Sequence, residues 1–358
     1  MTDASTTMPY RTIPHRAEPH RNGTDVPSGQ RILSGDRPTG PLHLGHYFGS
    51  LANRVQLQGA GGELFIVIAD YQVITDRDTP GSVAERALGL VLDYLGCGID
   101  PDRCVIFRHS AVPSLHQLML PFLSLVSSGE LDRNPTVKEE IRLSGRRAVN
   151  GLMLTYPVHQ AADILFCKAD LVPVGKDQLP HLELTRSIAR RFNERYQPVF
   201  PLPSGLLGEV GLLAGLDGRK MSKSLGNAIA LTDDPDTVAA KVLTARTDSE
   251  RLISYEPDRR PAVANLLTLA ALCSRSRPEQ LAKQLGAGGG LALKHLVIDA
   301  VNDFLTPIRR RRAEFQPADA AELLARGARR ARTIADQTLA EVLRAMGMAD
   351  ESACAALR

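Results

Sequence analysis

Long hydrophobic runs and paired cysteines are both missing from this sequence of 358 residues. No stretch approaches the roughly 18 apolar residues that a membrane-spanning helix needs, and none has the pattern of a secretory signal. The five cysteines are scattered without CxxC spacing, which is typical of buried thiols in a reducing compartment. Tryptophan is absent, so the protein has no indole fluorescence of its own. We expect a cytoplasmic protein with no membrane contact, no disulfides and no metal ligands.

Several sequence signatures of common enzyme classes are also missing. There is no GxxxxGK[ST], no GxSxG and no HExxH, which excludes a P-loop kinase or ATPase, a nucleophile-elbow hydrolase and a zincin protease. Forty-three basic residues against forty acidic ones give a net charge of +3. This charge is too small to require a nucleic-acid partner, although a local basic face would suffice for one.

The chain has three parts by composition and pattern. Residues 1–30 hold no apolar run and predict a flexible tail. Residues 31–226 alternate short apolar runs with helical stretches, which predicts an α/β domain built on a doubly wound parallel sheet. Strand signals vanish after Asn227, so residues 227–358 predict an all-helical C-terminal domain.

The expected elements follow from hydrophobic periodicity. The expected strands are Arg31–Ser34, Leu64–Ala69, Cys104–Phe107 and Leu171–Val174. The expected helices of the α/β part are Leu44–Leu57, Val83–Leu95, Ser114–Ser127 and His181–Tyr196. Those of the C-terminal part are Asp236–Arg246, Ala262–Ser274, Leu291–Arg312 and Ala318–Met346. On the last of them Arg326, Arg329 and Arg330 share a face, which fits either phosphate contacts or a solvated surface.

The first candidate nucleotide motif is His43-Leu-Gly-His46, which follows the first strand through a loop rich in glycine and proline. A helix begins there, and its amino end attracts anions. The two histidines lie on one face of the first turn and can donate hydrogen bonds to phosphate oxygens, while Gly45 leaves room for a nucleotide. Alone, the motif fits two capping histidines or half of a metal site equally well.

The second candidate motif is Lys220-Met-Ser-Lys-Ser224, which follows a glycine-containing loop. Two lysines on a mobile loop can close over a triphosphate and neutralise the charge that develops on leaving pyrophosphate. The alternative is a solvated lysine-rich loop, but a complete KMSKS pentapeptide is rarely a chance occurrence.

Together, HLGH and KMSKS resemble the paired signatures of class I aminoacyl-tRNA synthetases. The resemblance extends over residues 31–348 and is closest to the bacterial tryptophanyl-tRNA synthetases. Stretches that support it are Ser34-Gly-Asp-Arg-Pro-Thr-Gly40, Gly129-Glu-Leu-Asp-Arg133, Ala161-Ala-Asp-Ile-Leu165 and Leu171-Val-Pro-Val-Gly175.

This resemblance implies a Rossmann-type catalytic domain over 31–226, with a connecting insertion at about 110–150, and a helical anticodon-binding domain over 227–358. It also implies a homodimer. The implied reaction activates L-tryptophan with ATP to tryptophanyl-AMP and pyrophosphate, with Mg²⁺ held by the phosphates. The acyl group then passes to the 3′-terminal adenosine of tRNA(Trp). Both nucleophiles come from the substrates, so no catalytic serine or cysteine is required.

The resemblance also implies the residues of the ATP site. His43, His46, Lys138, Lys220 and Lys223 are expected to act in catalysis, with Lys138 reaching the triphosphate from the insertion. The rest of the site is expected to comprise Arg37, Pro38, Thr39, Gly45, Gly175, Lys176, Asp177, Met221, Ser222 and Ser224, with Val210 as a candidate adenine contact.

A tryptophan pocket is implied around Asp163, whose carboxylate would accept the indole N–H. The stretch from Tyr156 to Asp163 is expected to start a helix. Gln178 and Tyr156 would bind the amino and carboxylate groups of the ligand. The indole slot would be formed by Leu33, Gly35, Val172 and Val174, although plain sheet core explains these aliphatic residues nearly as well.

Two pocket residues depart from the usual bacterial pattern. Gln160 stands where methionine is common, and Gln72 where histidine is common. Both resemble a divergent, often auxiliary branch of these enzymes. The spacing Tyr156-x₃-Gln160-x₂-Asp163 is also that of tyrosine-activating enzymes, so tyrosine remains an alternative substrate. Another HxGH nucleotidyltransferase, or a paralogue that no longer charges tRNA, are further alternatives.

Overall fold

The computed structural model describes residues 11–12, 29–75, 81–144, 150–175, 178–207 and 213–349. Its parallel strands form one sheet in the order β1-β6-β5-β2-β3-β4. The strands are β1 (Arg11–Thr12), β2 (Arg31–Asp36), β3 (Glu63–Ile68), β4 (Cys104–Arg108), β5 (Leu171–Val174) and β6 (Ser204–Leu207). The predicted doubly wound parallel sheet is confirmed, and each expected strand lies within two residues of an observed one.

The strand β6, which lies between the edge strand β1 and β5, was not predicted. Its four residues, Ser-Gly-Leu-Leu, contain too few apolar side chains to stand out from the proline-rich stretch before them. In the sheet β6 pairs with β5 along its whole length, from Leu171 opposite Ser204 to Val174 opposite Leu207. Pairing with a neighbouring strand, and not local propensity, makes this segment a strand.

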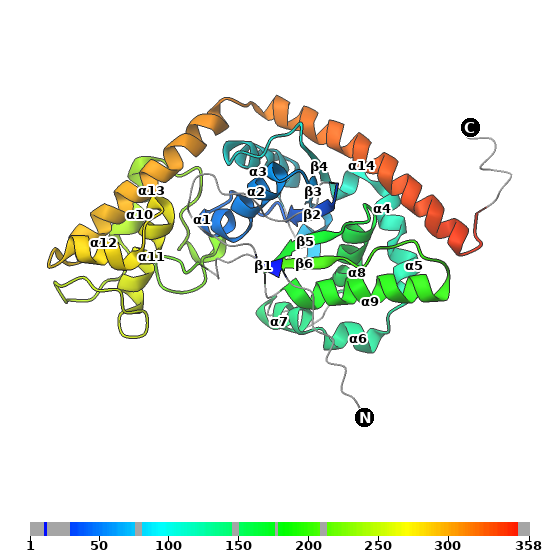
Figure 1. Ribbon diagram of the computed structural model, residues 1–358, viewed down its shortest axis with the longest axis horizontal. Helices are drawn as coiled ribbons and strands as arrows, with labels where there is room; N and C mark the ends of the chain where they lie inside the picture. The colour runs from blue at the N-terminus through cyan, green and yellow to red at the C-terminus, as the bar shows by residue number, and fades with distance from the viewer. Residues whose placement is uncertain are drawn as a thin grey trace.

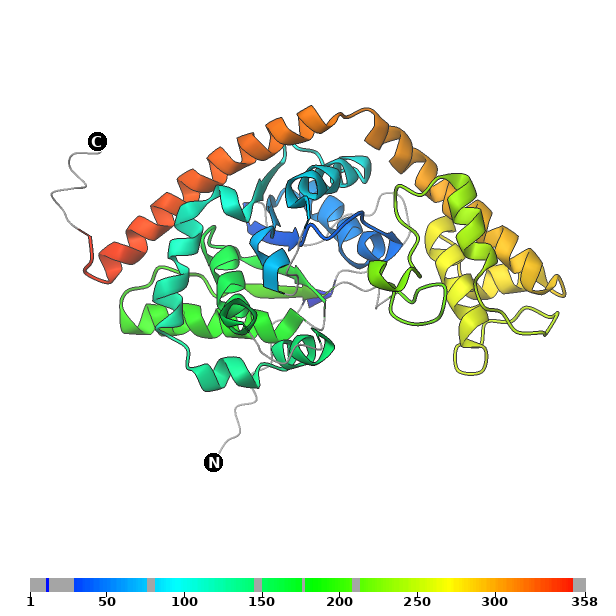
Figure 2. The same cartoon turned by 180° about the vertical axis from the view of Figure 1, so that it is seen from behind.

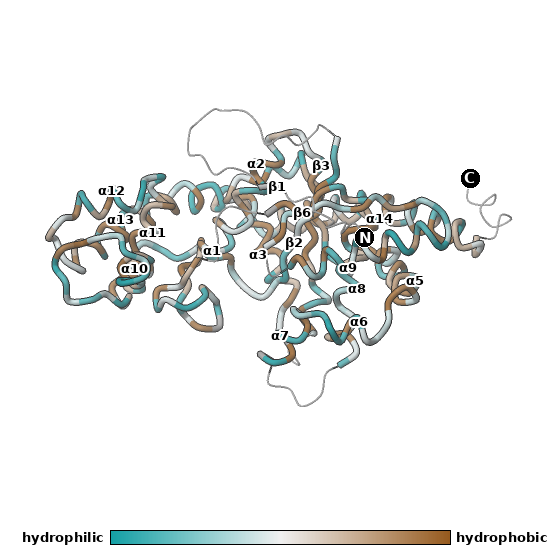
Figure 3. Tube along the Cα trace, turned by 60° about the horizontal axis from the view of Figure 1, so that its bottom comes forward, coloured by the Kyte–Doolittle hydropathy of each residue, from teal (hydrophilic) through white to brown (hydrophobic). Residues whose placement is uncertain are grey.

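The strands are hydrophobic on both faces because helices cover both sides of the sheet (Figures 1 and 2). Ile66 and Ile68 of β3 face one core, whereas Phe65 and Val67 face the other. Successive side chains of a strand point to opposite faces, so an uninterrupted apolar run is what a doubly covered strand needs. The hydrophobic segments accordingly gather where the sheet lies (Figure 3).

The expected helix over Leu44–Leu57 is present, but its middle is a π-helical segment. α1 (Leu44–His46) continues through η1 (Tyr47–Leu51) into α2 (Ala52–Gly59). The rings of Tyr47 and Phe48 pack on Phe304 of α13 (Gly289–Ala313), at centroid distances of 4.9 and 5.2 Å. The π-helical segment therefore directly follows the histidine motif, and its aromatic side chains pack this part of the chain against α13.

The expected helix over Ser114–Ser127 is interrupted. The structure has α4 (Pro113–Gln117) and α5 (Met119–Leu123) in its place. Pro121 has no N–H to donate to the carbonyl of Gln117, so a continuous helix would lose a bond at this point. The other expected helices are present as α3 (Val83–Gly96), α9 (Leu179–Arg195), α10 (Pro235–Leu243), α11 (Pro261–Ser274), α13 and α14 (Pro317–Ala345).

The helix that carries Tyr156 and Asp163 begins earlier than expected. α8 runs over Gly151–Leu165, so Tyr156 lies in its second turn and does not start it. The side chain of Asn150 caps the helix by accepting from the N–H of Met153 at 2.7 Å. The expectation of a start at Tyr156 was wrong because it rested on the stretch from Tyr156 to Asp163, which does not include the capping residue Asn150.

The helices after residue 227 lie in two places (Figure 1). α10, α11, α12 (Pro278–Leu285) and α13 pack together as a lobe beside the sheet, whereas α14 crosses back over β4, α3 and α4. On α14 Arg326 pairs with Asp102 at 2.8 Å, and Arg330 lies 3.4 Å from Glu63. The predicted division into a catalytic domain and a C-terminal domain at residue 226 remains a prediction. α14 follows the lobe in sequence, but it packs on β4 of the sheet. No described helix is long and apolar enough to cross a membrane.

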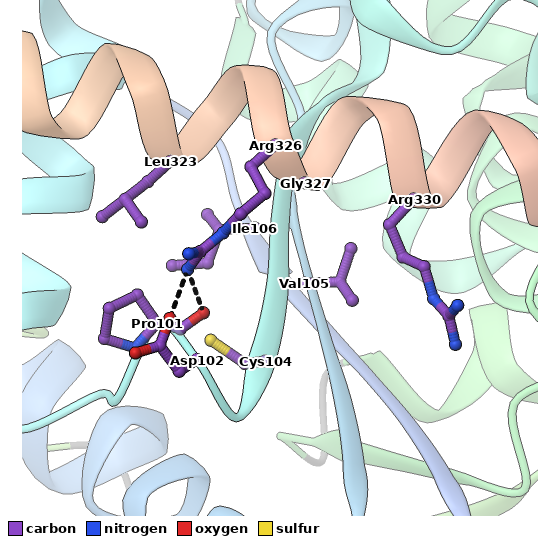
Figure 4. A pocket seen from close by; sticks show the side chains of 9 residues that line it. All are labelled: Pro101, Asp102, Cys104, Val105, Ile106, Leu323, Arg326, Gly327 and Arg330. Carbon is purple, nitrogen blue, oxygen red and sulfur yellow. Dashed lines mark hydrogen bonds and ion pairs between the residues drawn. The ribbon is translucent and has the colours of Figure 1, made fainter.

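Gly327 is the residue that lets α14 approach β4 (Figure 4). A Cβ atom at this position would lie 1.8 Å from the carbonyl oxygen of Ile106, which is backbone and cannot rotate away. A cavity of about 330 Å³ lies along the same crossing, between Pro101, Leu323 and Arg330.

We predict that Gly327→Ala lowers the free energy of unfolding by about 1–3 kcal/mol, because α14 must move off β4. Gly89→Ala in α3 is the control, since no atom lies within 4 Å of the added methyl group. It should leave stability unchanged or raise it by up to about 1 kcal/mol. Urea unfolding of both variants measures this, and equal midpoints would contradict the packing argument.

Candidate active site

The centre of the site is the point where the winding of the sheet reverses, between β2 and β5. Ligands of doubly wound sheets bind beyond the carboxyl ends of the strands at such a point. The loop after β2 holds Arg37, Pro38 and Thr39, and β5 ends at Val174 beside Gly175. Pro38 is buried, and its carbonyl accepts a hydrogen bond from Arg86 Nε at 2.9 Å, which fixes the loop on α3.

A buried ion pair holds the end of β2. Asp36 accepts hydrogen bonds from Arg54 at 2.5 Å and from the hydroxyl of Tyr94 at 2.6 Å. Burial alone would raise the pKa of Asp36, but the guanidinium of Arg54 outweighs it and holds the pKa at about 2. Arg54 also donates to the carbonyl of Gly35, so the pair fixes the strand end from which the nucleotide loop departs. Sequence reasoning missed both Arg54 and Tyr94.

Gly35 is required by the close approach of β2 and β3. A Cβ atom there would lie 2.4 Å from both the carbonyl oxygen and a methyl group of Val67. The glycine therefore serves strand packing, whatever further contact it makes with a ligand.

His43 and His46 lie side by side at the start of α1. Their ring centroids are 3.7 Å apart, and the N–H of His43 donates to Nδ1 of His46 at 3.2 Å. Burial, with a smaller contribution from the nearby Lys223, lowers the pKa of His43 to about 3 and that of His46 to about 4. Both rings are therefore neutral near pH 7 and can donate an N–H to an anion without adding a fixed charge.

Backbone pairing brings the two sequence motifs together. His43 forms an antiparallel bridge with Ala230, flanked by hydrogen bonds from Leu44 N to Ile229 O at 3.0 Å and from Leu231 N to Leu42 O at 2.9 Å. The lysine motif immediately precedes this segment. As a result Lys223, the first residue of η5 (Lys223–Leu225), donates from Nζ to the carbonyl of Gly40 at 2.7 Å.

A cavity of about 290 Å³ lies between the two motifs. Its walls come from both of them and from α10, and the lining residues are Thr39, Gly40, Pro41, His43, Lys223, Gly226, Ala228, Ala230 and Lys241. Lys241, which sequence reasoning missed, pairs with Asp233 at 2.6 Å. Cationic side chains, the neutral imidazole of His43 and a helix amino end around one cavity fit an anionic ligand such as a triphosphate.

The lysine motif is shaped by Asn227, another residue that was not predicted. Its carboxamide accepts from Ser222 N at 2.8 Å and donates to Asp217 at 2.7 Å and to the carbonyl of Lys220. The bond from Asn227 contributes most to the low pKa of Asp217, which is about 2. Met221 is buried, whereas the side chain of Lys220 is exposed and reaches no wall of the cavity.

A second group of predicted residues lies around α8, on the face of the sheet to which Leu33 and Val172 point. Asp163 and Tyr156 are buried, and Gln160 and Gln72 are half-buried, with Gln72 on η2 (Tyr71–Thr75) packed against α8. The hydroxyl of Tyr156 pairs with His181 Nε2 at 2.9 Å. Asp163 Oδ1 lies 2.7 Å from Nε2 of His109, a fully buried residue that sequence reasoning missed.

The aliphatic residues expected to line the indole slot divide in two. Leu33 and Val172 are buried in the same core as Val158 and Ile164 of α8, as the plain core interpretation holds, while Val174 is half-buried at the strand end. Gln178 stands at the amino end of α9, with its N–H bonded to the carbonyl of Gly175 at 3.0 Å.

Several predicted residues are not brought to the cavity or cannot be placed. Lys138 is exposed on α7 (Pro135–Ser144), which packs against α6 (Ser128–Arg133), α8 and α9. Lys176, Asp177, Val210 and the side chain of Ser224 lie outside the described residues.

Comparison with known proteins gives a consistent result. Residues 28–306 match the family described as tRNA synthetases class I (W and Y). The tryptophan–tRNA ligase of Treponema pallidum is 44% identical over 334 residues, which are 89% of this chain and 97% of that protein. That of Streptococcus pyogenes serotype M1 is 42% identical over 335 residues, 88% and 98% of the two chains.

A solved structure agrees with these relatives. The tryptophanyl-tRNA synthetase of Campylobacter jejuni, complexed with ADP and tryptophan, matches with a TM-score of 0.78 at 30% identity. The match covers 88% of this chain and 99% of that one. The tyrosyl-tRNA synthetase of Archaeoglobus fulgidus, at 24% identity and a TM-score of 0.62, shares the fold.

The buried neutral histidines make stability depend on pH. Their folded-state pKa values, about 3 and about 4, lie below the ordinary value of 6.5, so the unfolded chain takes up protons that the folded chain refuses. Their contribution is fully present above about pH 6.5 and is lost as the pH falls toward 4. We predict a loss of at most about 2 kcal/mol per histidine between about pH 7 and pH 5.

The variant His46→Asn isolates this effect. Urea unfolding at the two pH values should show a smaller acid loss in the variant than in the wild type. Parallel pH dependences in the two proteins would mean that His46 takes up its proton equally in the folded and unfolded states, so that burial does not shift its pKa.

Proposed function

The chain belongs to the class I tRNA synthetase family of the tryptophan and tyrosine enzymes and is an ATP-dependent tryptophan–tRNA ligase, and we propose that the cavity between its two motifs binds the triphosphate of ATP. The enzyme activates L-tryptophan to tryptophanyl-AMP, with release of pyrophosphate, and transfers the acyl group to tRNA(Trp). The observation that carries the proposal is the backbone bridge between His43 and Ala230, which joins the two motifs around the cavity.

Catalysis at the ATP end is a matter of position and charge. The tryptophan carboxylate attacks the α-phosphorus, and negative charge moves onto the leaving pyrophosphate. Lys223 and Lys220 neutralise this charge, with Lys220 reaching in from its exposed position on the loop. His43 and His46 donate N–H groups to the phosphate oxygens. Mg²⁺, held by the phosphates of ATP, supplies further positive charge.

At the amino-acid end, Asp163 selects tryptophan by accepting the indole N–H. The carboxylate is buried among apolar residues of α8, where an unmade hydrogen bond is costly. A site of this kind rejects side chains that lack the donor by a larger factor than shape alone allows. Gln72, Gln160, Gln178 and Tyr156 complete this end of the site in the proposal.

Further parts of the proposal rest on the family resemblance alone. They are the homodimer, the cytoplasmic location, anticodon binding by the helical lobe, and the roles of Lys138, Gly175, Lys176, Asp177 and Val210. None of them enters the geometric argument above.

ATP–pyrophosphate exchange measured with tryptophan, tyrosine and phenylalanine in parallel tests the activation step. We predict exchange with tryptophan alone. Because the chain contains no tryptophan, the fluorescence of bound ligand reports binding in the same samples. Exchange with tyrosine would reassign the pocket to the tyrosine alternative, and binding without exchange would indicate a paralogue that no longer activates its ligand.

The variant Asp163→Asn extends this test to the pocket. We expect the KM for tryptophan to rise by about 10–100-fold, the worth of a hydrogen bond to a charged group, while the KM for ATP stays unchanged. Asp258→Asn, at an exposed position, is the matched control. An unchanged KM for tryptophan in Asp163→Asn would remove Asp163 from the pocket.

A separate prediction concerns Lys223. Its replacement by alanine should lower kcat of the exchange reaction by about 10²–10³-fold, which is typical of a single group that stabilises developing charge. Tryptophan binding, followed by ligand fluorescence, should not change. Lys283→Ala on the exposed face of α12 is the control. A variant with normal kcat would show that Lys223 serves only to bind Gly40.

A further inference from the structure

Three histidines gather around Asp163 although they are far apart in the sequence. His109 comes from η3 (His109–Ala111), His116 from α4, and His159 lies one turn before Asp163 on α8. His109, His159 and Asp163 are buried, and His116 is half-buried. The ring centroids of His109 and His159 are 4.6 Å apart, and those of His116 and His159 are 5.0 Å apart.

The hydrogen bonds among the rings fix their tautomers. Nε2 of His116 lies 2.7 Å from the carbonyl oxygen of His109, which can only accept, so this nitrogen carries the proton. Nδ1 of a neutral His116 is then an acceptor, and it is 2.8 Å from Nε2 of His159, which must donate. In a neutral His159 ring only one of the two nitrogens carries a proton. The remaining nitrogen, Nδ1 of His159, is left with a bare lone pair.

This lone pair belongs to a group of buried polar atoms that lack hydrogen bonds. Nδ1 of His159, both ring nitrogens of His109 and Oδ1 of Asp163 have no hydrogen-bond partner among the described residues. His109 Nε2 lies only 2.7 Å from Asp163 Oδ1, but the contact lacks hydrogen-bond geometry. Each such buried atom costs about 1–3 kcal/mol when nothing pairs with it.

We propose that His109, His159 and Asp163 form a binding site for a divalent zinc ion. One ligand atom from each residue lies within 4.8 Å of the others, and two imidazoles with one carboxylate form a ligand set that zinc uses in sites with an open fourth position. His116 orients His159 through the bond at its far nitrogen, as the outer partner of a metal-bound histidine does.

Zinc binding requires a small movement of two ligands, and no second acidic residue is available as the fourth ligand. Two ligands of a tetrahedral zinc ion stand about 3.3 Å apart, so His109 and Asp163 must separate by about half an ångström. Asp70 is not available, because its carboxylate accepts from Ser110 N, Ser110 Oγ and Tyr71 N. The fourth position is therefore left to water.

The site makes zinc an antagonist of the amino-acid substrate. This step rests on the proposed function, in which Asp163 accepts the indole N–H. A carboxylate oxygen that coordinates zinc cannot also accept that hydrogen bond, and an ion between His159 and Asp163 occupies the space in front of the carboxylate. Zinc and tryptophan therefore exclude one another, and each weakens the binding of the other by the same factor.

The direct test is zinc binding to the full-length enzyme after treatment with a chelator and dialysis. Titration calorimetry should show one zinc ion per chain at this site, and Co²⁺ as a probe should give the visible absorption of a four-coordinate ion. His159→Gln should weaken zinc binding by more than about 100-fold and His116→Asn by about 10–100-fold, because the second variant only releases the orientation of His159. His295→Gln, at an exposed histidine of α13, should bind zinc as the wild type does.

The functional arm uses exchange activity with Mg²⁺ restored. Added zinc should raise the KM for tryptophan but not that for ATP in the wild type, and this rise should disappear in His159→Gln. Saturating tryptophan should in turn weaken zinc binding. Exchange activity without zinc binding would overturn this inference alone, and so would equal zinc binding by His159→Gln and the wild type. Zinc binding without tryptophan-dependent exchange would leave the metal site standing and remove the proposed role of Asp163.

Discussion

The short antiparallel pairing of residues 42–44 with residues 229–231 is the constraint on which the nucleotide site depends. Two backbone hydrogen bonds and the bridge between His43 and Ala230 join segments that are separated by slightly more than half of the chain. They set the distance from which Lys223 reaches Gly40 and the width of the cavity. The pairing is itself held from behind, because the buried carboxylate of Asp93 accepts from Leu42 N at 3.0 Å and from Arg312 at 2.8 Å. Asp93 thereby connects α13 of the helical lobe to the loop that carries the histidines. A movement of α13 would therefore shift this loop and change the shape of the cavity.

Charge is distributed so that the acid at the end of β2 is already neutralised. Asp36 would repel a triphosphate if it faced the cavity as a free carboxylate, but Arg54 and Tyr94 hold it in a buried network. Burial leaves both histidines of the first motif uncharged, and Lys241 is paired with Asp233. In the proposed ATP site the positive charge therefore comes mainly from the lysine motif. This arrangement suits a reaction in which charge moves during the step, because a strongly cationic resting site would bind substrate and transition state equally well.

The sequence predicted what local pattern determines and missed what the fold assembles. Strands such as Leu171–Val174 and helices such as α9 follow from the hydrophobic period. Each nucleotide motif is a short uninterrupted stretch of sequence, so it can be recognised without the fold. β6 was missed because pairing with β5 defines it. The start of α8 was misplaced because its cap, Asn150, lies outside the stretch from Tyr156 to Asp163 on which the prediction rested. Arg54, Asn227 and His109 were missed for a different reason. Each acts through a partner that is distant in sequence or through a bond to the backbone, and no spacing rule reports such a contact.

α8 shows how one helix can impose two demands on the same carboxylate. In the proposed function Asp163 supplies a buried acceptor for the indole N–H, and the turn before it places His159 on the same side. A buried carboxylate with a single partner has a fixed orientation, whereas here His109 approaches it closely without a proper hydrogen bond. The cluster is thus left unsatisfied until something enters it. In the proposed function the carboxylate oxygen that would accept the indole N–H is the same one that would coordinate the metal ion, so occupancy of the pocket would be set by the concentrations and affinities of the two ligands.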